Sequence, residues 1–146
     1  MTSVAHPDLH ARIEASFVRQ GMMQNLGARL VSVAPGEVEI ALPYSERVTQ
    51  QQGGYHGGAM GALADIAAGY AGLTLAAEGQ EVTTVEYKIN VLAAFQGGEL
   101  RARGHVVRAG KRLIITTAEV VHLDDNGVES PCALMQQTLA TVTKTY

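Results

Sequence analysis

The stretch from Gly57 to Ala77, GGAMGALADIAAGYAGLTLAA, constrains the fold of this chain more than any other. Almost all of its residues are small or apolar, and Asp65 carries the only formal charge between Val48 and Ala77. A helix that is apolar on most sides belongs in a protein core. A lone carboxylate there is costly to bury unless it is paired or used in chemistry. We therefore predict a central helix over about residues 57–77, with Asp65 as its candidate functional group.

A membrane span is the other interpretation of such a run, because about twenty apolar residues can cross a bilayer. Gly and Ala dominate the run, Leu and Ile are few, and Asp65 lies near its middle. These features disfavour insertion into a membrane. We expect a buried helix and no membrane partner.

Composition indicates a globular protein, which we predict to be one domain over residues 1–146. The chain is 47% hydrophobic and 17% charged, with a net charge of -3 that gives no long-range attraction for nucleic acid. The single cysteine, Cys132, cannot form an internal disulfide, which favours a reducing compartment. The first residues have neither a basic nor an apolar segment typical of a signal peptide. We therefore expect a cytoplasmic protein.

Residue periodicity predicts the remaining elements. Leu9, Ile13 and Phe17 recur at a spacing of four and predict an amphipathic helix over about residues 6–20, ending at Gly21. Six segments have the composition or alternation of strands: 28–33, 37–42, 81–91, 99–108, 111–122 and 133–143. Short turns between consecutive strands favour antiparallel pairing. The predicted fold is of the α+β class, with a curved antiparallel sheet wrapped around one long central helix.

The central helix has two unlike sides when its residues are placed at 3.6 per turn. The bulky side is expected to pack into the sheet, and its residues are Leu63, Ile66, Tyr70 and Leu73. The other side permits close approach of another backbone, and its residues are Gly58, Gly61, Asp65, Ala68 and Gly72. Two hypotheses account for the glycines: dense packing within the chain, or helices lying side by side in a two-fold dimer.

The dimer follows if Asp65 and the start of the helix act on the same substrate. Gly57 and Asp65 are eight residues apart, or roughly 12 Å along one helix. One protomer cannot present both groups to one atom. Two antiparallel copies crossing near Gly61 would bring the helix start of one copy to Asp65 of the other, and two-fold symmetry would produce two equivalent sites.

Such a site has recognisable chemistry. The unpaired N–H groups at the helix start, near Gly57, suit a carbonyl oxygen that becomes an oxyanion. Asp65 is a candidate nucleophile or general base. Gln50 could position water, Thr84 could contact the carboxylate, and His56 is expected to orient the turn. Each could also be structural, His56 by bonding the local backbone and Asp65 by pairing with a distant group.

Other chemistries find little support in the sequence. Cys132 lacks the context of a known cysteine nucleophile and is interpreted as a small apolar strand residue. No cluster of His, Cys, Asp or Glu has metal-ligand spacing, and no phosphate-binding loop of the GxxxxGK[ST] type occurs. We expect neither a metal nor a cofactor.

Gln50 followed by YHGGAMGALAD resembles the signature of hot-dog-fold acyl-CoA thioesterases of the PaaI type, in which HGG precedes a helical acid by a fixed spacing. The resemblance extends from about Met22 to Thr143 and includes the segment Val106–Arg112. It implies a hot-dog fold and hydrolysis of acyl-CoA thioesters at a homodimer interface, often within a tetramer of two dimers. Coenzyme A is then part of the substrate.

The resemblance also implies roles for individual residues. Asp65 matches the nucleophile or general base, Gly57 the N–H that polarises the thioester carbonyl, and His56 the histidine of the turn. Gln50, which is Asn in many relatives, matches the residue that holds the carbonyl or water, and Thr84 matches a Ser or Thr near the carboxylate. The remaining matches are to substrate-binding positions: Gly58, Gly110, Lys111 and Arg112. The alternative for the last three is a hairpin turn with solvated charges.

Two other functions remain open on the sequence. One is a non-catalytic acyl-CoA-binding protein, and the other is a hydratase or dehydratase of enoyl or 3-hydroxyacyl thioesters. The sequence fixes neither the acyl group nor the choice between a nucleophilic and a general-base role for Asp65. It also leaves the choice between dimer and tetramer open.

Overall fold

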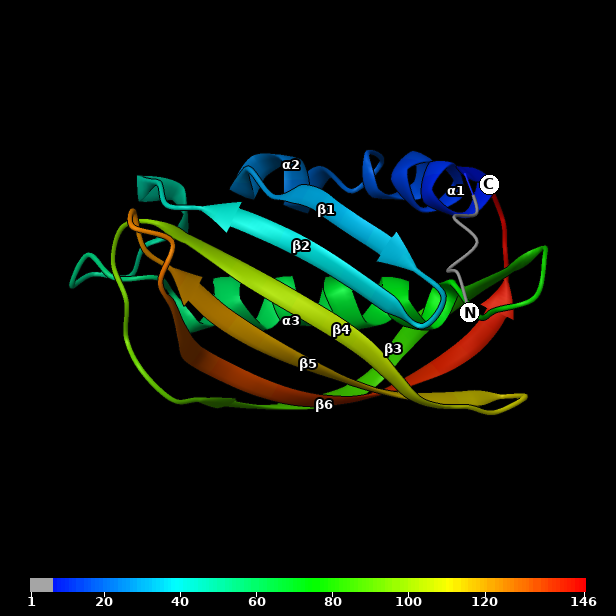
Figure 1. Ribbon diagram of the computed structural model, residues 1–146. Helices are drawn as coiled ribbons and strands as arrows, with labels where there is room; N and C mark the ends of the chain where they lie inside the picture. Colours follow the sequence, from blue (N-terminus) through cyan, green and yellow to red (C-terminus); the bar gives the residue numbers. More distant parts are fainter. Residues whose placement is uncertain (1–6) are drawn as a thin grey trace.

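A six-stranded antiparallel sheet curves around one long helix in the computed structural model, which describes residues 7–146 (Figure 1). The helices are α1 (Pro7–Phe17), α2 (Gly21–Leu26) and α3 (Gly57–Leu73), with a short 3-10 turn at Glu46–Val48. The strands are β1 (Arg29–Ala34), β2 (Glu37–Pro43), β3 (Gln80–Val91), β4 (Glu99–Ala109), β5 (Leu113–Leu123) and β6 (Glu129–Thr143). This arrangement confirms the α+β class and the hot-dog fold.

The strand order across the sheet is β1-β2-β4-β5-β6-β3. Every neighbouring pair is antiparallel. α3 connects β2 to β3 and lies in the hollow of the sheet, while α1 and α2 run beside β1 (Figure 1). The chain therefore crosses the whole sheet between β2 and β3, and β3 forms the edge opposite β1.

The expectation that β3 turns directly into a paired β4 is wrong. β3 pairs with β6 over its whole length, from Gln80 opposite Thr143 to Val91 opposite Ala133. Residues 92–98 instead carry the chain around the end of the sheet to β4 (Figure 1). Both flanks of β4 are occupied, by β2 and β5, so no edge is left for β3 there.

The predicted helix ends differ from those in the structure. α1 ends at Phe17 rather than near residue 20, and Gly21 begins α2 instead of ending α1. Position 6 of the expected first helix lies outside the described residues. α3 ends at Leu73 rather than 77, because the Thr74 hydroxyl donates to the Ala71 carbonyl and accepts from the Gly36 N–H. That pair of bonds ties the helix end to the β1–β2 turn.

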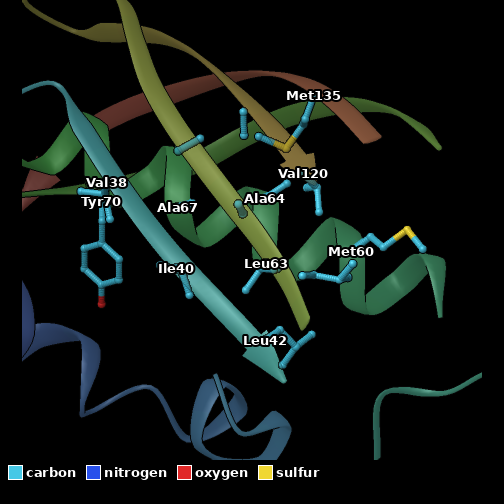
Figure 2. Close-up of a cluster of buried hydrophobic side chains, with 14 of the residues drawn as sticks. Val38, Ile40, Leu42, Met60, Leu63, Ala64, Ala67, Tyr70, Val120 and Met135 are labelled. Carbon is cyan, nitrogen blue, oxygen red and sulfur yellow. The ribbon is translucent and has the colours of Figure 1, made fainter. Parts of the chain in front are cut away.

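The core lies between α3 and the concave face of the sheet. Figure 2 shows aliphatic and sulfur-containing side chains of α3 and the strands meeting there. The labelled members are Val38, Ile40, Leu42, Met60, Leu63, Ala64, Ala67, Tyr70, Val120 and Met135. All are nearly fully buried. Burial of such apolar side chains provides most of the free energy that stabilises a small domain.

Two glycines mark the closest approaches of α3 to the sheet. A Cβ on Gly104 of β4 would overlap the backbone of α3, lying 2.5 Å from the Ala68 nitrogen. A Cβ on Gly72 of α3 would overlap the side chain of Leu139 on β6. Dense packing within the chain therefore accounts for Gly72, one of the two explanations left open for the helix glycines.

The two predicted sides of α3 need correction. Gly61, Ala68 and Gly72 are buried, whereas Ile66, expected to pack into the sheet, is only half-buried. The side of α3 that the sheet leaves uncovered carries Gly58, Ala62, Asp65, Ile66 and Gly69. We call this the open stripe. The prediction that α3 has an open side with small residues is confirmed. In the structure that side is rotated about the helix axis by part of a turn from the predicted one, because the sheet covers α3 from both flanks.

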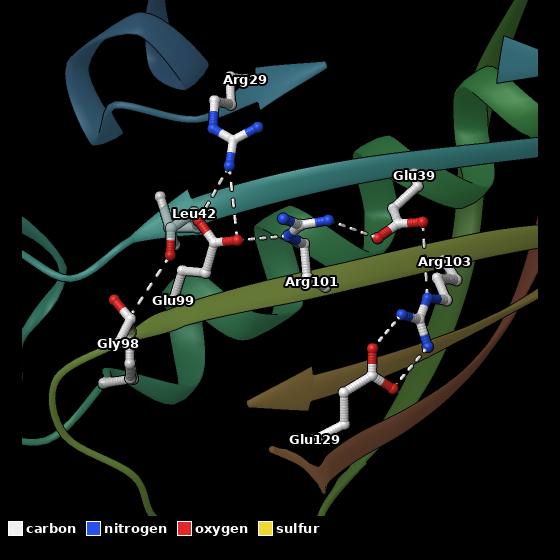
Figure 3. Close-up of polar contacts among 9 residues, drawn as sticks. Arg29, Glu39, Leu42, Gly98, Glu99, Arg101, Arg103 and Glu129 are labelled. Carbon is white, nitrogen blue, oxygen red and sulfur yellow. Dashed lines mark hydrogen bonds and ion pairs between the residues drawn. The ribbon is translucent and has the colours of Figure 1, made fainter. Parts of the chain in front are cut away.

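A ladder of ion pairs crosses the outer face of the sheet (Figure 3). Arg101 pairs with Glu39 at 3.0 Å and with Glu99 at 2.5 Å, and Arg103 pairs with Glu129. These arginines are close in the sequence to Lys111 and Arg112, but their charges are already neutralised by carboxylates. They therefore offer no free positive patch to an anionic ligand.

Candidate active site

Asp65 lies on the open stripe of α3, where two polar side chains hold its carboxylate. Thr84 of β3 donates its hydroxyl to Asp65 Oδ1 at 2.7 Å. The amide nitrogen of Gln137, on β6, donates to the same oxygen. Gln137 is itself fixed, because its Oε1 accepts from the buried Thr116 hydroxyl at 2.9 Å. The carboxylate is therefore oriented by groups from two strands and is no solvated surface charge.

A β-bulge places Thr84 on the correct face of β3. The pairing register of β3 with β6 shifts between Thr84 and Glu86, so one extra residue, Val85, is inserted. Regular alternation would put Thr84 and Tyr87 on opposite faces of the strand. With the bulge both approach α3, since a Cβ on Gly61 would lie 3.2 Å from the Tyr87 hydroxyl. Bulges commonly redirect a side chain in this way beside a functional site.

The pKa of Asp65 is raised above that of an ordinary aspartate. Burial is the main cause, because it disfavours the charged form, and the hydrogen bonds from Thr84 and Gln137 act in the opposite direction. A carboxylate with a raised pKa is a stronger base once ionised. Asp65 is therefore suited to accept a proton from water or to attack a carbonyl carbon.

Sequence reasoning missed Gln137. Met135, Gln137 and Leu139 alternate on β6, and all three are buried. An amide in the middle of an inward-facing apolar row is the signal that could have identified it, because a buried amide requires partners. The sequence alone does not predict the pairing register of β6, which places Gln137 next to Asp65.

The start of α3 provides one free backbone donor. His56 precedes the helix, and its Nδ1 accepts from the Gly58 N–H at 2.8 Å. Within residues 7–146, no acceptor reaches the Gly57 N–H. Gly57 is exposed, and a Cβ built on it would meet nothing within 4 Å. The expected orienting role of His56 is thus a bond to the local backbone, and the N–H that remains available is that of Gly57.

One chain does not bring all of the predicted catalytic residues together. Asp65 and Thr84 are in contact, whereas His56 and Gly57 lie at the start of the same helix, and Gly57 is eight residues or about 12 Å from Asp65. Gln50 lies in the loop before α3, where its Oε1 accepts from the backbone N–H of Gln52. The site therefore divides into a carboxylate half and a helix-start half.

Three of the predicted substrate-binding residues, Gly110, Lys111 and Arg112, occupy the turn between β4 and β5. Lys111 and Arg112 are exposed, and no carboxylate of residues 7–146 lies within ion-pair distance of either. Gly110 closes the turn by donating its N–H to the Leu113 carbonyl at 2.9 Å. The two cations are available to an anionic group in solution.

A cavity of about 480 Å³ opens beside Asp65. Its walls come from α1, the open stripe of α3, and β3, and Thr84 lines it next to the carboxylate. Pockets of this volume accommodate small organic ligands. The candidate catalytic group therefore faces a space large enough for a substrate.

Two other expectations concern metals and membranes. In the part of the chain that the structure describes, no three His, Cys, Asp or Glu side chains are grouped so as to hold a metal ion. Over the same residues, no helix has the length and apolar character needed to cross a bilayer.

Comparison with known proteins identifies the family. Residues 52–129 match the model of the Thioesterase superfamily. The fold is similar to a solved thioesterase family protein from Silicibacter pomeroyi, with 36% identity, a TM-score of 0.89, and coverage of 93% of this chain and 99% of that one. It is also similar in fold to the PaaI protein of E. coli, with 21% identity, a TM-score of 0.82 and coverage of 94% and 95%.

One curated relative is named for the reaction that it catalyses. The 1,4-dihydroxy-2-naphthoyl-CoA hydrolase of Listeria monocytogenes is 31% identical over 91 residues, which cover 62% of this chain and 74% of that protein. The family match and the similarity to the Silicibacter pomeroyi protein make the chain a member of the Thioesterase superfamily, with a hot-dog fold. It is a thioester hydrolase.

Proposed function

We propose that this hydrolase cleaves acyl-CoA thioesters to a free acid and coenzyme A, at sites that each combine two protomers of a homodimer. The observation that carries the proposal is the Asp65 carboxylate. Thr84 and Gln137 hold it at the wall of a cavity, and burial raises its pKa. The relative that hydrolyses a CoA thioester supports the choice of substrate class.

In the proposed reaction, the thioester carbonyl oxygen accepts a hydrogen bond from the Gly57 N–H of one protomer. Asp65 of the other protomer removes a proton from water, whose oxygen attacks the carbonyl carbon. The resulting oxyanion is stabilised at the helix start. Collapse breaks the carbon–sulfur bond, and the proton held by Asp65 passes to the leaving thiolate. Direct attack by Asp65 would give an anhydride that water then hydrolyses, with the same products.

Replacement of Asp65 tests the proposal. We expect Asp65→Asn and Asp65→Ala to lower kcat for acyl-CoA hydrolysis by about 100-fold or more, the range for loss of a general base. The measurement is release of free thiol from acetyl-, hexanoyl- and benzoyl-CoA. Asp125→Asn, in the exposed β5–β6 turn, controls for the loss of one negative charge. Hydrolysis by Asp65→Ala at the wild-type rate would refute the mechanism.

The Gly57 N–H can be removed without altering the turn. Proline is tolerated at the first position of a helix, and His56 already has the extended backbone (φ -69, ψ 135) that a residue before proline adopts. We expect Gly57→Pro to lower kcat by about 100-fold. Gly57→Ala keeps the N–H and has open space around it, so its loss is expected to be far smaller. Equal losses in the two variants would exclude the N–H as the donor.

Lys111 and Arg112 are proposed to bind the phosphates of coenzyme A. Their replacement by alanine is then expected to raise KM while leaving kcat nearly unchanged, and to weaken the dependence of KM on salt. Unchanged KM in the double variant would assign these residues to a solvated turn.

The alternative functions make different predictions in the same assays. A binding protein would retain acyl-CoA without releasing thiol, and a hydratase would add water to crotonyl-CoA. No observation favours the hydratase, since the His56 Nδ1 accepts a hydrogen bond from the local Gly58 N–H.

A further inference from the structure

Two connecting segments meet at the start of α3. The first, residues 44–56, leads into the helix, and the second, residues 92–98, carries the chain from β3 around the end of the sheet to β4. The Tyr55 N–H donates to the Phe95 carbonyl at 2.9 Å, which ties the first segment to the second. Tyr55 is two residues before Gly57. The position of the Gly57 N–H therefore depends on how firmly the second segment is held.

His122 of β5 holds the second segment in two ways. Its ring is buried and stacks on the ring of Phe95, with the centroids 4.4 Å apart and 5° between the ring planes. Its Nε2 lies 2.9 Å from the Gly97 carbonyl oxygen. A carbonyl oxygen accepts but does not donate, so Nε2 carries the hydrogen of this bond. His122 thus fixes both the backbone of the segment and one of its side chains.

Few other groups hold this part of the chain. Of residues 94–97, only the carbonyls of Phe95 and Gly97 have a backbone hydrogen bond within the described residues, and His122 provides the only side-chain donor. Gly97 and Gly98 have left-handed backbones, with φ of 74° and 58°. A Cβ on Gly98 would lie 3.1 Å from His122 Nε2. The segment therefore turns tightly against the His122 ring.

A buried histidine needs a reason, because a polar side chain in a core costs free energy unless it is bonded. Among residues 7–146, the buried polar side chains are Thr116, His122 and Gln137. Two of them act on the carboxylate half of the site, since Thr116 donates to Gln137, which donates to Asp65. His122 lies on the same inward-facing row of β5 as Thr116. Its contacts lead to the other half of the site, at the helix start.

Two more aromatic rings extend the contact from His122 into the first segment. The Tyr55 ring meets the His122 ring edge-on, with the centroids 6.3 Å apart, and the Tyr44 ring meets that of Tyr55 at 5.4 Å. Edge-to-face pairs at such distances are attractive. The Tyr44 hydroxyl donates to the Gly53 carbonyl at 2.6 Å, in the stretch that carries Gln50. The rings therefore connect His122 both to the helix start and to the loop of Gln50.

We infer that His122 is a positioning residue for the oxyanion half of the site: through Phe95 and Tyr55 it keeps the Gly57 N–H directed at the substrate carbonyl. The inference rests on the proposed function and adds to it a residue that does not touch the substrate. One strand, β5, then supports both halves of the site. In the proposed dimer, Thr116 and His122 of the same chain serve two different sites.

Replacement of His122 separates its hydrogen bond from its stacking. His122→Phe keeps a ring that can stack on Phe95 and removes the donor to Gly97. We expect kcat for hexanoyl-CoA, measured by release of free thiol, to fall about tenfold while KM changes by less than about twofold, because an oxyanion donor acts in the transition state. His122→Gln has an amide N–H at the same number of bonds from Cα and should restore kcat to within about threefold of wild type.

A double-mutant cycle with Gly57→Pro distinguishes positioning from loss of stability. In Gly57→Pro no N–H remains to be positioned, so adding His122→Phe should lower kcat by less than about twofold further. In Thr84→Val, whose defect lies in the carboxylate half, His122→Phe should keep its effect of about tenfold. Ile114→Val removes buried volume from the same strand without touching either segment, and it should leave kcat unchanged in each background.

Phe95→Leu removes the other ring of the stacked pair and enters the same cycle if His122→Phe does not fold. The positioning role is overturned if these variants leave kcat unchanged, or if they lower it by the same factor in wild type and in Gly57→Pro. In either case hydrolysis that depends on Asp65 would still support the proposed function. Hydrolysis of hexanoyl-CoA that does not depend on Asp65 would refute that function, and the inference with it.

Discussion

The Asp65 carboxylate is subject to two opposing influences. Partial burial raises its pKa, and the hydrogen bonds from Thr84 and Gln137 lower it. A carboxylate with no donors in such a place would stay protonated to a higher pH and would be a poorer catalyst near neutrality. Thr84 and Gln137 are thus positioning residues that also keep the base ionised.

Removing either donor is expected to shift the pH dependence of catalysis. In Thr84→Val and Gln137→Met the pKa of Asp65 rises further, because a bond that favours the charged form is lost. A base must be ionised to act, so the acidic limb of kcat/KM against pH should move to higher pH in both variants. Thr84→Ser keeps the hydroxyl and should restore the wild-type limb. If the acidic limb stays in place while the rate falls at all pH values, Thr84 and Gln137 have only a structural role.

The same raised pKa makes a prediction about stability. The folded chain binds the Asp65 proton more tightly than the unfolded chain does, so ionisation lowers the free energy of unfolding as pH rises from about 4, the ordinary range for Asp, through the folded pKa. That cost is fully present above the folded pKa. We expect Asp65→Asn to be more stable than wild type at pH 8, with a gap that shrinks toward pH 4.5 in urea unfolding. A gap that widens on acidification would contradict this account, and Asp125→Asn serves as the control.

At the level of single residues, the sequence predicts part of the site. Asp65 is identifiable because it is the only charge in an apolar run, and its contact with Thr84 is present in the structure. The reason that Thr84 faces Asp65 is the bulge at Val85, which simple alternation does not predict. Gln137 was not predictable without the register of β6, since its partners Asp65 and Thr116 lie on other elements.

Among the elements, α3 and β4 are pressed together at Gly104. The backbone of α3 at Ala67 and Ala68 occupies the space where a Cβ of residue 104 would lie. Two backbones at this distance cannot separate without moving the whole helix. The position of Asp65, two residues earlier on α3, is therefore fixed by contact of the helix with the centre of the sheet.

Alanine substitutions at three glycines should have graded effects on stability. Gly104→Ala is expected to cost about 3 kcal/mol, because the obstacle is backbone. Gly72→Ala should cost less, since the obstacle is the movable end of the Leu139 side chain. Gly69→Ala should stabilise by about 0.5–1 kcal/mol. Chemical unfolding of the three variants measures the order, and destabilisation by Gly69→Ala would show that its surroundings are not open.

The elements themselves were predictable to different degrees. All six strands follow from composition or alternation, and the central helix follows from its continuous run of small and apolar residues. The neighbour of β3 did not follow, since pairing depends on which sheet edge is free. The end of α3 at Leu73 also did not follow, because it depends on a hydrogen bond that Thr74 accepts from the N–H of Gly36, which is distant in the sequence.

The whole molecule leaves one long edge strand uncovered. β3 is mostly exposed, and three of its apolar side chains, Val85, Tyr87 and Val91, are between 44% and 59% exposed. Apolar edge strands favour association with another strand. The same strand carries Thr84 next to Asp65. These features support a two-fold dimer with β3 and the open stripe of α3 at its interface, as the proposed shared site requires.

Mixing two inactive variants tests whether the site is shared. In a dimer of Asp65→Asn with Gly57→Pro, one site carries both defects and the other carries none. Random assortment after co-refolding gives mixed dimers in half of the population, each with one intact site of two, so we expect about a quarter of wild-type activity. Sites contained within one chain would show no recovery. Each variant refolded alone provides the baseline.

The eight-residue separation of Gly57 and Asp65 along α3 also determines how the reaction rate depends on the concentration of the enzyme. If an intact site exists only in the dimer, the number of sites follows the dimer population. Once the protein is diluted below the dissociation constant of the dimer, that population falls with the square of the total concentration. Halving the enzyme would then quarter the rate, and a plot of rate against protein concentration would change slope from one to two on logarithmic axes.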